Sequence, residues 1–410
     1  AMSAGCWMRR LAVVVALVAG LAVAIWLTLD SGDGPVPEAR VTSTSTSSAA
    51  TTTSTLFDPT TTAPPPPSIT PSISPEERLL LAWTRGRLPK GFSRQVAGLE
   101  QVTGVTTVRG GMLHLVDPDP GLPGGFVIPV EALAFDPITY PSVRPGERSA
   151  WLQELGRREV VLGSTSARLR PERPGDGLEV ADGPPLEAAG VAEDGAVGGG
   201  EVAMTTDTGE EVGVDTPRYL LLRYTGDRAL LEGSIRALLP GDVAVRVRAP
   251  GETQILRHAD SVLPQAAIKD VFGEFSYRAT ETGFEMDTGW QEESIITSDV
   301  PLLGQLRCHR DLVPSLTGAM EELIDRGLDT LIDRSQGCFN PRFVAGQESI
   351  SRHAWGAAVD INIGTGSEGR RSIQDPRLLE VMERWGFTSG HDWLLPDPGH
   401  FEYIRPPGEG

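Results

Sequence analysis

Two histidines in the C-terminal part of the chain stand beside carboxylates, in short runs of small and apolar residues. His353 and Asp360 are seven residues apart in SRHAWGAAVDIN, and His400 follows Asp397 by three residues in DPGHFEY. Either histidine alone would be read as a packed structural residue, but two of them with matched carboxylates favour a metal site. Two imidazoles and one carboxylate are a common protein ligand set for catalytic zinc, with water in the fourth position. We therefore predict that His353, Asp360 and His400 bind Zn²⁺.

A further carboxylate that reaches this water without binding the metal would complete the chemistry. Such a group acts as the general base that hydrolysis by a zinc site needs. Asp397 lies in a Pro/Gly-rich stretch three residues before His400. A turn there can point both side chains to the same side, so Asp397 is the predicted catalytic base.

The elements that must position these residues are two expected strands. The run AAVDINI at 357–363 consists mostly of small and apolar residues and predicts a buried strand that holds Asp360 rigidly, and HFEYI at 400–404 predicts a second strand. Burying an unpaired carboxylate costs several kcal/mol, so Asp360 needs a cation, a metal or a strong donor as partner.

Two helices and a further strand are expected around them as scaffold. One helix begins with Asp311 as its cap and ends at Gly327, and another begins with Asp375 as its cap and ends at Gly386. The segment between the first helix and the metal motif, LDTLID at 328–333, predicts a strand.

The two motifs resemble those of the zinc D-alanyl-D-alanine carboxypeptidase family, which includes the VanY type and the L-alanyl-D-glutamate endopeptidases. The signature S-x-H-x-x-G-x-A-x-D is matched at every fixed position, by Ser351, His353, Gly356, Ala358 and Asp360. The second element, an acid three residues before a histidine, is matched by Asp397 and His400. HDWLLPDPGHFE resembles the endopeptidase branch in particular. The resemblance covers residues 295–405.

This resemblance implies an α+β fold, a hedgehog/DD-peptidase-like zinc domain with a small antiparallel sheet and flanking helices. It implies zinc held by His353, Asp360 and His400, with Asp397 activating the water that attacks a peptide carbonyl of the peptidoglycan stem. The family also has an arginine upstream of the first motif, near the substrate, and Arg342 in CFNPRF is in a comparable place. Arg342 is therefore expected to bind the oxyanion or a substrate carboxylate, although a surface arginine would look the same.

Other polar residues near the motifs receive lesser roles. Glu402 lies two residues beyond His400 and would share its face of a strand, where it could orient the imidazole or form a plain salt bridge. Ser351 is expected to support the motif by hydrogen bonding, and Arg352 to point away from the metal. His391 is expected on the cleft rim or a surface loop. The remaining histidines are expected to be structural: His114, His258 and His309.

The N-terminal part of the chain predicts a membrane anchor. Arg9 and Arg10 precede an apolar run of nineteen residues, 11–29, which as a helix would span about 28 Å. The arginines predict a cytoplasmic N-terminus and an extracytoplasmic remainder. A cleaved signal peptide is the alternative, with AVA at 22–24 as its cleavage site. We expect a single-pass protein of the cell membrane.

Four parts follow from these patterns. A Ser/Thr/Pro-rich segment at 31–75 has too few apolar residues to fold and predicts a disordered stalk. The segment 76–285 predicts an α+β middle region, either one unit or two small modules split by a long acidic loop at 171–217. The run PEERLLLAWTRGRL at 75–88, where this region begins, predicts a helix, and Gly110-Gly111 predicts a hairpin turn. The parts are 1–30, 31–75, 76–285 and 295–405.

Charge and cysteines limit the partners and the compartment. The formal net charge of −19 argues against nucleic acid, because few cations are available to neutralise phosphates. Cys308 and Cys338 form an even pair, which in an exported protein predicts a disulfide; closing a loop of that length contributes about 3–4 kcal/mol.

The sequence therefore predicts a membrane-anchored zinc metallopeptidase that acts on peptidoglycan peptides, with the bond it cuts left open between carboxypeptidase and endopeptidase. The alternative is a non-catalytic wall-binding or scaffold protein that retains a zinc fold. The middle region could also bind a partner protein.

Overall fold

The computed structural model describes residues 78–117, 125–170, 174–281, 283–363 and 374–404. All of them belong to the second of the two units into which the chain divides, Thr62–Gly410. The predicted anchor at 1–30 and the predicted stalk at 31–75 lie outside the described residues.

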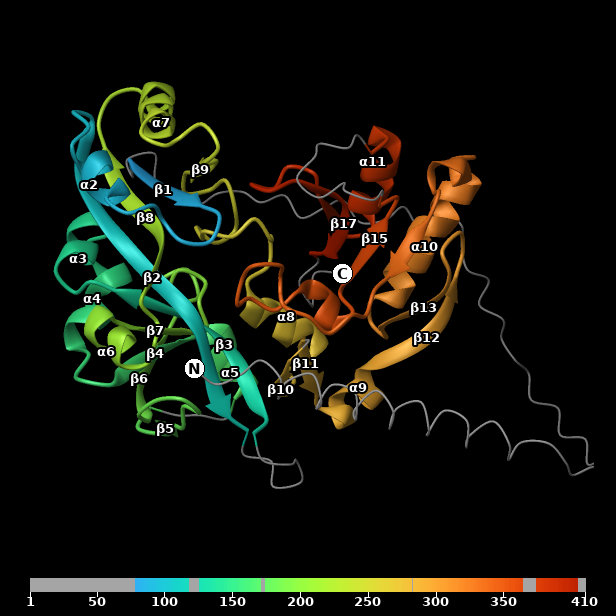
Figure 1. Ribbon diagram of the computed structural model, residues 1–410, viewed down its shortest axis with the longest axis horizontal. Helices are drawn as coiled ribbons and strands as arrows, with labels where there is room; N and C mark the ends of the chain where they lie inside the picture. Colours follow the sequence, from blue (N-terminus) through green and yellow to red (C-terminus); the bar gives the residue numbers. More distant parts are fainter. Residues whose placement is uncertain (1–77, 118–124, 171–173, 282, 364–373, 405–410) are drawn as a thin grey trace, which may run out of the picture. The chain divides into compact units, whose positions relative to one another are not determined.

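The first half of the described chain forms a large mixed sheet (Figure 1). Its strand order is β5-β6-β4-β7-β3-β2-β8-β1-β9, and the hairpin β10-β11 joins it through β3. Neighbouring strands are antiparallel except for the pairs β3·β7 and β4·β6. The strands are β1 (Leu79–Thr84), β2 (Val102–Val116), β3 (Val127–Phe135), β4 (Glu159–Gly163), β5 (Gly177–Leu178), β6 (Leu186–Ala192), β7 (Val202–Thr205), β8 (Thr216–Tyr224), β9 (Val245–Arg248), β10 (Tyr277–Thr280) and β11 (Gly283–Met286).

Short helices pack beside this sheet and bury both of its faces. Strand β1 illustrates this, because Leu81 and Trp83 belong to one core cluster while Leu80 and Ala82 belong to another. The helices of this region are α2 (Phe92–Ala97), α3 (Thr139–Val143), α4 (Glu147–Glu154), α5 (Ser164–Leu169), α6 (Thr206–Glu211) and α7 (Arg228–Ala237).

Three local predictions for this region are wrong. The described part of the expected helix at 75–88 contains strand β1 instead, because an apolar run buried on both faces lacks the alternation that marks a strand. Gly110 and Gly111 lie inside β2, where a Cβ on Gly110 would lie 3.0 Å from Leu133 Cδ2; these glycines allow close packing and do not form a turn. The expected loop at 171–217 contains β5, β6, β7, α6 and the first residues of β8; in β6 Glu187 is exposed between the buried Leu186 and Ala188.

The second half of the described chain forms two smaller antiparallel sheets with helices around them. One has two strands, β12 (Ile295–Val300) and β13 (Gly304–His309), and the other has the order β14-β15-β17-β16. Its strands are β14 (Ser335–Gly337), β15 (Ala358–Ile361), β16 (Phe387–Gly390) and β17 (Asp397–Tyr403). The helices are α8 (Gln265–Phe272), α9 (Thr288–Ser294), α10 (Val313–Asp325) and α11 (Pro376–Arg384), with single 3-10 turns η1 (Asp329–Leu331) and η2 (Arg352–Trp355).

The predicted strands at 357–363 and 400–404 correspond to β15 and β17, and the two predicted helices to α10 and α11. Asp375 caps α11 as expected, accepting from the backbone N–H of Arg377. Asp311 does not cap α10, which begins after Leu312 without a side-chain cap. The expected strand at 328–333 is the 3-10 turn η1, because its backbone groups bond locally, as from Leu331 N to Leu328 O.

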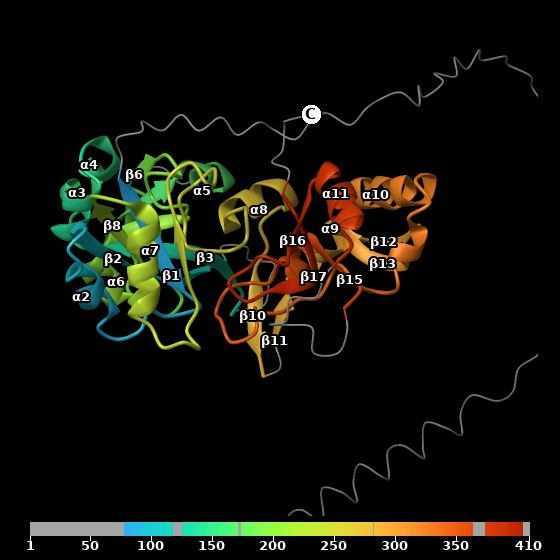
Figure 2. The ribbon, with the colours of Figure 1, turned by 90° about the horizontal axis from the view of Figure 1, so that it is seen from above.

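Helices α10 and α11 lie side by side on this region (Figure 2) and fix its packing. The Trp385 ring fills the space beside Gly318 so closely that a Cβ there would approach it to 2.3 Å. Trp385 Nε1 donates to Glu322 Oε2 over 2.9 Å, and Arg384 pairs with Glu322 at 2.7 Å. These contacts hold the sheet that carries β15 and β17.

The predicted fold class and localisation need correction. The expected architecture, a transmembrane helix and an α+β middle region before a C-terminal domain with a small antiparallel sheet, is wrong as a description of the whole: the described chain is α+β, but its main sheet is large and mixed. Among the helices of the described residues, none has the length and apolar character needed to cross a bilayer. The expectation of a single-pass membrane protein thus finds no support in the described residues, and the segment 11–29 on which it rested lies outside them.

A buried cluster of charges joins the large sheet to helix α8. Lys269 Nζ lies 2.9 Å from Glu201 Oε2 and 2.7 Å from Glu274 Oε2, and Arg170 Nη2 lies 2.9 Å from Glu201 Oε2. Burial alone would raise the pKa of Glu201, but Lys269 and Arg170 outweigh it and lower the pKa to about 2. Ile268 and Phe272 of the same helix belong to the core around β15 and β17. Helix α8 therefore connects the two halves.

Replacing Lys269 by Met should lower the free energy of unfolding by about 3–5 kcal/mol, because Glu201 would keep a buried charge without its lysine partner. Lys90→Met is the matched control, since Lys90 is exposed. Chemical denaturation of both variants measures the difference. Equal stability of the two variants would show that the cluster contributes nothing to the connection.

Candidate metal centre

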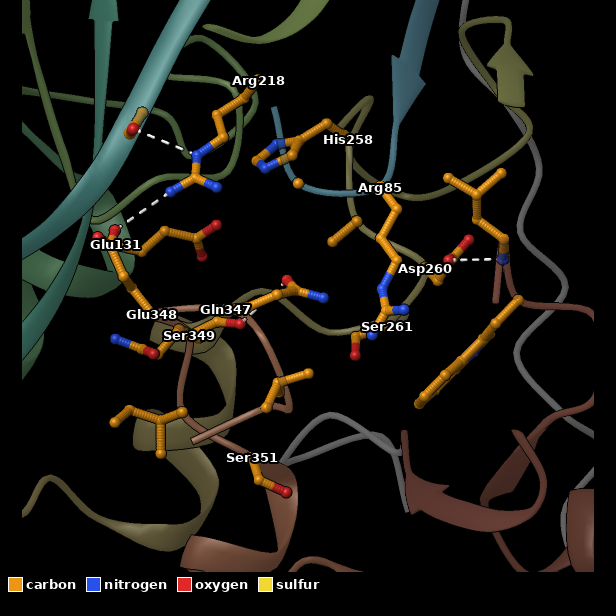
Figure 3. A pocket seen from close by; sticks show the side chains of 18 of the residues that line it. Arg85, Glu131, Arg218, His258, Asp260, Ser261, Gln347, Glu348, Ser349 and Ser351 are labelled. Carbon is orange, nitrogen blue, oxygen red and sulfur yellow. Dashed lines mark hydrogen bonds and ion pairs between the residues drawn. The ribbon is translucent and has the colours of Figure 1, made fainter. Parts of the chain in front are cut away.

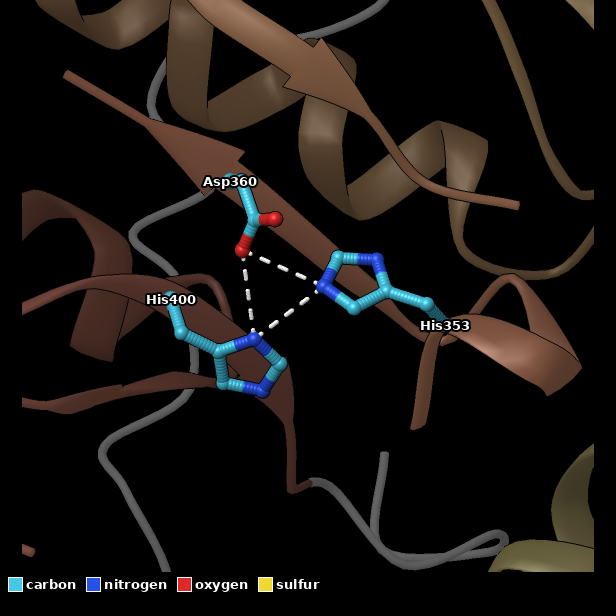
Figure 4. Close-up of side chains that lie close together, drawn as sticks. All are labelled: His353, Asp360 and His400. Carbon is cyan, nitrogen blue, oxygen red and sulfur yellow. Dashed lines mark hydrogen bonds and ion pairs between the residues drawn. The ribbon is translucent and has the colours of Figure 1, made fainter. Parts of the chain in front are cut away.

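Three side chains from separate elements meet in the C-terminal region (Figure 4). His353 Nε2 lies 3.1 Å from Asp360 Oδ1 and 3.2 Å from His400 Nδ1, and His400 Nδ1 lies 3.2 Å from Asp360 Oδ1. The three atoms form a nearly equilateral triangle. Both histidines are buried and Asp360 is nearly so.

Local structure explains why these residues meet. Asp360 on β15 and His400 on β17 are directly opposite each other in the antiparallel pair, and their side chains leave the same face of the sheet. His353 comes from η2, where the Ser351 hydroxyl accepts from the His353 N–H over 3.4 Å. Gly356 ends η2 at φ 63°, and a Cβ there would lie 2.6 Å from the backbone nitrogen of His309. Only glycine fits this position.

The outer contacts of the two imidazole rings decide which ring nitrogen carries the proton. In each neutral ring, the nitrogen that faces the triangle is then left with its lone pair. His353 Nδ1 lies 2.8 Å from the carbonyl oxygen of Cys338; a carbonyl only accepts, so Nδ1 carries the proton and Nε2 of the neutral ring does not. His400 Nε2 is buried and lies 3.8 Å from Glu402 Oε2, so a proton there faces a carboxylate. Nδ1 of the neutral ring then presents its lone pair.

The triangle has the dimensions of a zinc site. Three acceptor atoms this close repel one another unless a cation lies between them. Metal–ligand distances of about 2.0–2.1 Å in a tetrahedron give ligand separations of about 3.3–3.4 Å, slightly longer than the separations found here. The donor set therefore fits a small divalent cation.

The electrostatics of the site favour positive charge. Burial acts to raise the pKa of Asp360, but contacts with the two histidines, which carry a proton toward Asp360 when no cation lies between them, outweigh it and hold that pKa well below its usual range. Burial acts to lower the pKa of His400, but Asp360 and Glu402 raise it to about 9. The pKa of Glu402 is lowered, because contacts with His400 and Arg352 outweigh its burial. The negative charges of Asp360 and Glu402 therefore stabilise a positive charge at the triangle, which either a proton or a metal cation can supply.

Glu402, which the sequence suggested as a partner of His400, is held by the chain segment that precedes α8. Its Oε1 accepts from the N–H of Val262 over 3.0 Å and its Oε2 from the Ser261 hydroxyl over 3.1 Å. Arg352 points away from the triangle, as expected, and donates to the carbonyl of Leu263 over 2.6 Å. Glu402 and Arg352, beside the triangle, are thus fixed by a segment with no recognisable motif.

The predicted disulfide between Cys308 and Cys338 is present. It ties β13 to the segment after β14, and the carbonyl of Cys338 is the group that orients the His353 ring. The backbone N–H of Asn340 also bonds to the carbonyl of His353 over 2.9 Å. The disulfide therefore supports one corner of the triangle.

The two other predicted site residues line a cavity of about 320 Å³ that opens beside the triangle. Figure 3 shows part of its lining. Asp397 is the first residue of β17 and lines this cavity together with His400. It lies in a strand and not in the expected turn, and the pairing of β16 with β17 is irregular between Asp397 and Phe401. Arg342 also lines the cavity, and its carbonyl accepts from the N–H of Ser351.

The other wall of the cavity comes from strands of the large sheet and from the segments that follow β1 and β9, and it was not predicted. It includes Arg85, Glu131, Arg218 and Ser261. These residues come from separate stretches of the first half of the chain, where neither spacing nor composition marks a site. Only their contact with the C-terminal region identifies them.

The remaining histidines lie apart from the triangle. His391 Nε2 pairs with Asp392 at 3.0 Å, and His309 Nε2 lies 3.1 Å from the carbonyl of Phe272. His114 hydrogen bonds to the Tyr277 hydroxyl. His258 stacks on Tyr219 at the cavity wall, and burial with nearby arginines lowers its pKa to about 3, so it is neutral.

Comparison with known families gives one match. Residues 345–403 match a family described as D-alanyl-D-alanine carboxypeptidase. This segment contains all three corners of the triangle as well as Asp397. The match supports the resemblance at the level of the family and indicates a peptidase, but it does not extend to the VanY or endopeptidase branch within the family.

Comparison with curated proteins gave no match. Solved structures give weak likenesses. The periplasmic region of MacB from Actinobacillus actinomycetemcomitans has 12% identity and a TM-score of 0.30, over 41% of this chain and 88% of that one. The extracellular domain of the ABC-type transporter YknZ from Gram-positive bacteria has 11% identity and a TM-score of 0.29, over 42% of this chain and 100% of that one. A domain of a putative permease from Porphyromonas gingivalis has 14% identity and a TM-score of 0.27, over 46% of this chain and 94% of that one. At these TM-scores the likenesses support no conclusion about this chain.

Proposed function

We propose that this protein is a zinc peptidase that hydrolyses peptide bonds in the stem peptides of peptidoglycan. The observation that carries the proposal is the convergence of three lone-pair atoms at 3.1–3.2 Å, from His353, Asp360 and His400. These residues would hold the zinc ion. The match of residues 345–403 to a carboxypeptidase family supports the same reaction class.

Different residues of the chain would carry out the separate steps of the hydrolysis. When bound, zinc supplies Lewis acidity toward a peptide carbonyl and toward water. Asp397 accepts a proton from the attacking water and passes it to the leaving amine, which is general base and then general acid catalysis. Arg342 donates hydrogen bonds to the developing oxyanion or to a carboxylate of the substrate.

Two neighbouring groups keep the ligands in place. The carbonyl of Cys338 fixes the tautomer and the orientation of His353. Glu402 faces Nε2 of His400 and is itself held by Ser261 and Val262. Outer partners of this kind raise the basicity of ligating imidazoles and restrict their rotation.

Hydrolysis of defined muropeptides tests the proposal and identifies the bond. The zinc-loaded protein should release either a terminal D-alanine or internal stem fragments, recognised by mass. A chelator should abolish the reaction, and zinc should restore it. The proposal fails if the zinc-loaded protein cleaves no muropeptide, or if cleavage persists after complete removal of metal.

A further inference from the structure

The large sheet supplies one wall of the cavity beside the candidate metal centre. Arg85 follows β1 at the end of the sheet, and Ser261 lies in the segment between β9 and α8. On the opposite side, Val344 to Ser349 form a small loop closed by the backbone bond from Val344 N to Ser349 O. This loop leads directly into Ser351 and His353. A peptide bound at the metal would therefore contact residues of the sheet.

Most charges that line the cavity are paired within the protein. Arg218 Nη2 lies 3.4 Å from Glu348, Arg257 Nη2 lies 4.0 Å from Glu131, and Arg352 Nε lies 4.0 Å from Glu402. Asp260 pairs with Arg246 at 3.1 Å. The two opposite charges within each pair largely cancel, so these residues offer little net charge to a ligand.

Arg85 is the exception on the sheet side. Its Nη2 donates to the carbonyl oxygen of Ala345 over 3.2 Å, across the cavity, and it forms no ion pair with any carboxylate of the described residues. Figure 3 shows its guanidinium reaching into the middle of the cavity, near Gln347 and Ser261. Arg85 is exposed, so a ligand can reach the free edge of the guanidinium. Arg342, from the opposite wall, likewise has no carboxylate partner among the described residues.

We propose that Arg85 is a specificity-determining residue that binds a carboxylate of the substrate away from the scissile bond. A guanidinium presents a rigid fork of N–H donors that matches a carboxylate bidentately. With Arg342 in the other wall, the cavity presents two unpaired cations to one ligand. The substrate class that fits is an acidic peptide with a free carboxylate several bonds from the cleaved amide. This inference rests on the proposed function and deepens it.

Matched peptides test the inference. One stem peptide carries a free side-chain carboxyl, and its partner carries the amide at the same position. The wild-type protein should have a kcat/KM about tenfold higher for the free acid, the size expected of one charged hydrogen-bonded contact. Arg85→Gln should make the kcat/KM values of the two peptides equal, because glutamine carries no charge. Arg85→Lys should restore part of the preference, because it restores the charge.

Arg87→Gln is the matched control. Arg87 lies two residues away, is exposed and does not line the cavity, so the control should keep the wild-type preference. If Arg85→Gln retains the preference, or loses activity equally on both peptides, the inference is wrong while the peptidase proposal stands.

Calorimetric binding of the two peptides to the zinc-loaded protein separates the inference from the proposed function. Tighter binding of the free acid, lost in Arg85→Gln, supports the inference even if neither peptide is cleaved. Equal binding of both peptides, or no binding of either, overturns it, whatever the hydrolysis assay gives.

Discussion

Replacing Asp397 by Asn should abolish hydrolysis while the protein keeps its zinc. The amide has nearly the same size as the carboxylate but accepts no proton, so the attacking water loses its base. General base catalysis contributes about 10²–10⁴-fold, and kcat should fall by that factor. Zinc content should not change, because Asp397 is not one of the three residues of the triangle. Hydrolysis rates and bound zinc, measured on the same preparation, test both statements.

Asp392→Asn is the matched control, because Asp392 is exposed and pairs with His391 outside the cavity. It should keep both zinc and activity. A non-catalytic protein that retains a zinc fold would lose nothing in either variant. Full activity of Asp397→Asn would therefore remove Asp397 from the mechanism, and its loss of zinc would make Asp397 a ligand.

Replacing Asp360 by Asn should remove both zinc and activity. The change keeps the shape of the side chain but deletes the only negative charge in the triangle, and a neutral amide is a poor zinc ligand. The fall in zinc affinity should exceed the about 10–100-fold that loss of an outer partner costs. Competition with a chelator of known affinity measures it.

Asp325→Asn controls for the loss of one acid from the same region, since Asp325 is exposed at the end of α10. It should bind zinc like the wild type. Equal zinc affinity in Asp360→Asn and wild type would contradict the assigned ligand set. A folding check by circular dichroism distinguishes loss of metal from loss of structure.

The candidate site could be located from the sequence because its residues form two short motifs on strands that pair. His353 and Asp360 are close in the chain, and the strand pattern around Asp360 and His400 predicted both β15 and β17. What the pattern could not give was the opposition of Asp360 and His400, because strand register depends on contacts between segments that are distant in sequence.

The wall of the cavity formed by the sheet could not be predicted for a related reason. Strand β1 is buried on both faces, and its run LLLAWT has no alternation, so the period of the pattern was misread as a helix. Arg85 follows this strand, and its position relative to Arg342 is decided by packing of the sheet against α8 and the segment before it. Ser261 reaches Glu402 through the same packing. Neither the residue type nor the local sequence of Arg85 or Ser261 indicates that it lies beside the C-terminal region.

The position of zinc in crystals of the zinc-loaded protein tests the central claim most directly. Anomalous scattering at the zinc edge should give one peak within about 2.0–2.2 Å of His353 Nε2, Asp360 Oδ1 and His400 Nδ1 together. The absence of a peak at this triangle, or a peak bound by other residues, would contradict the account.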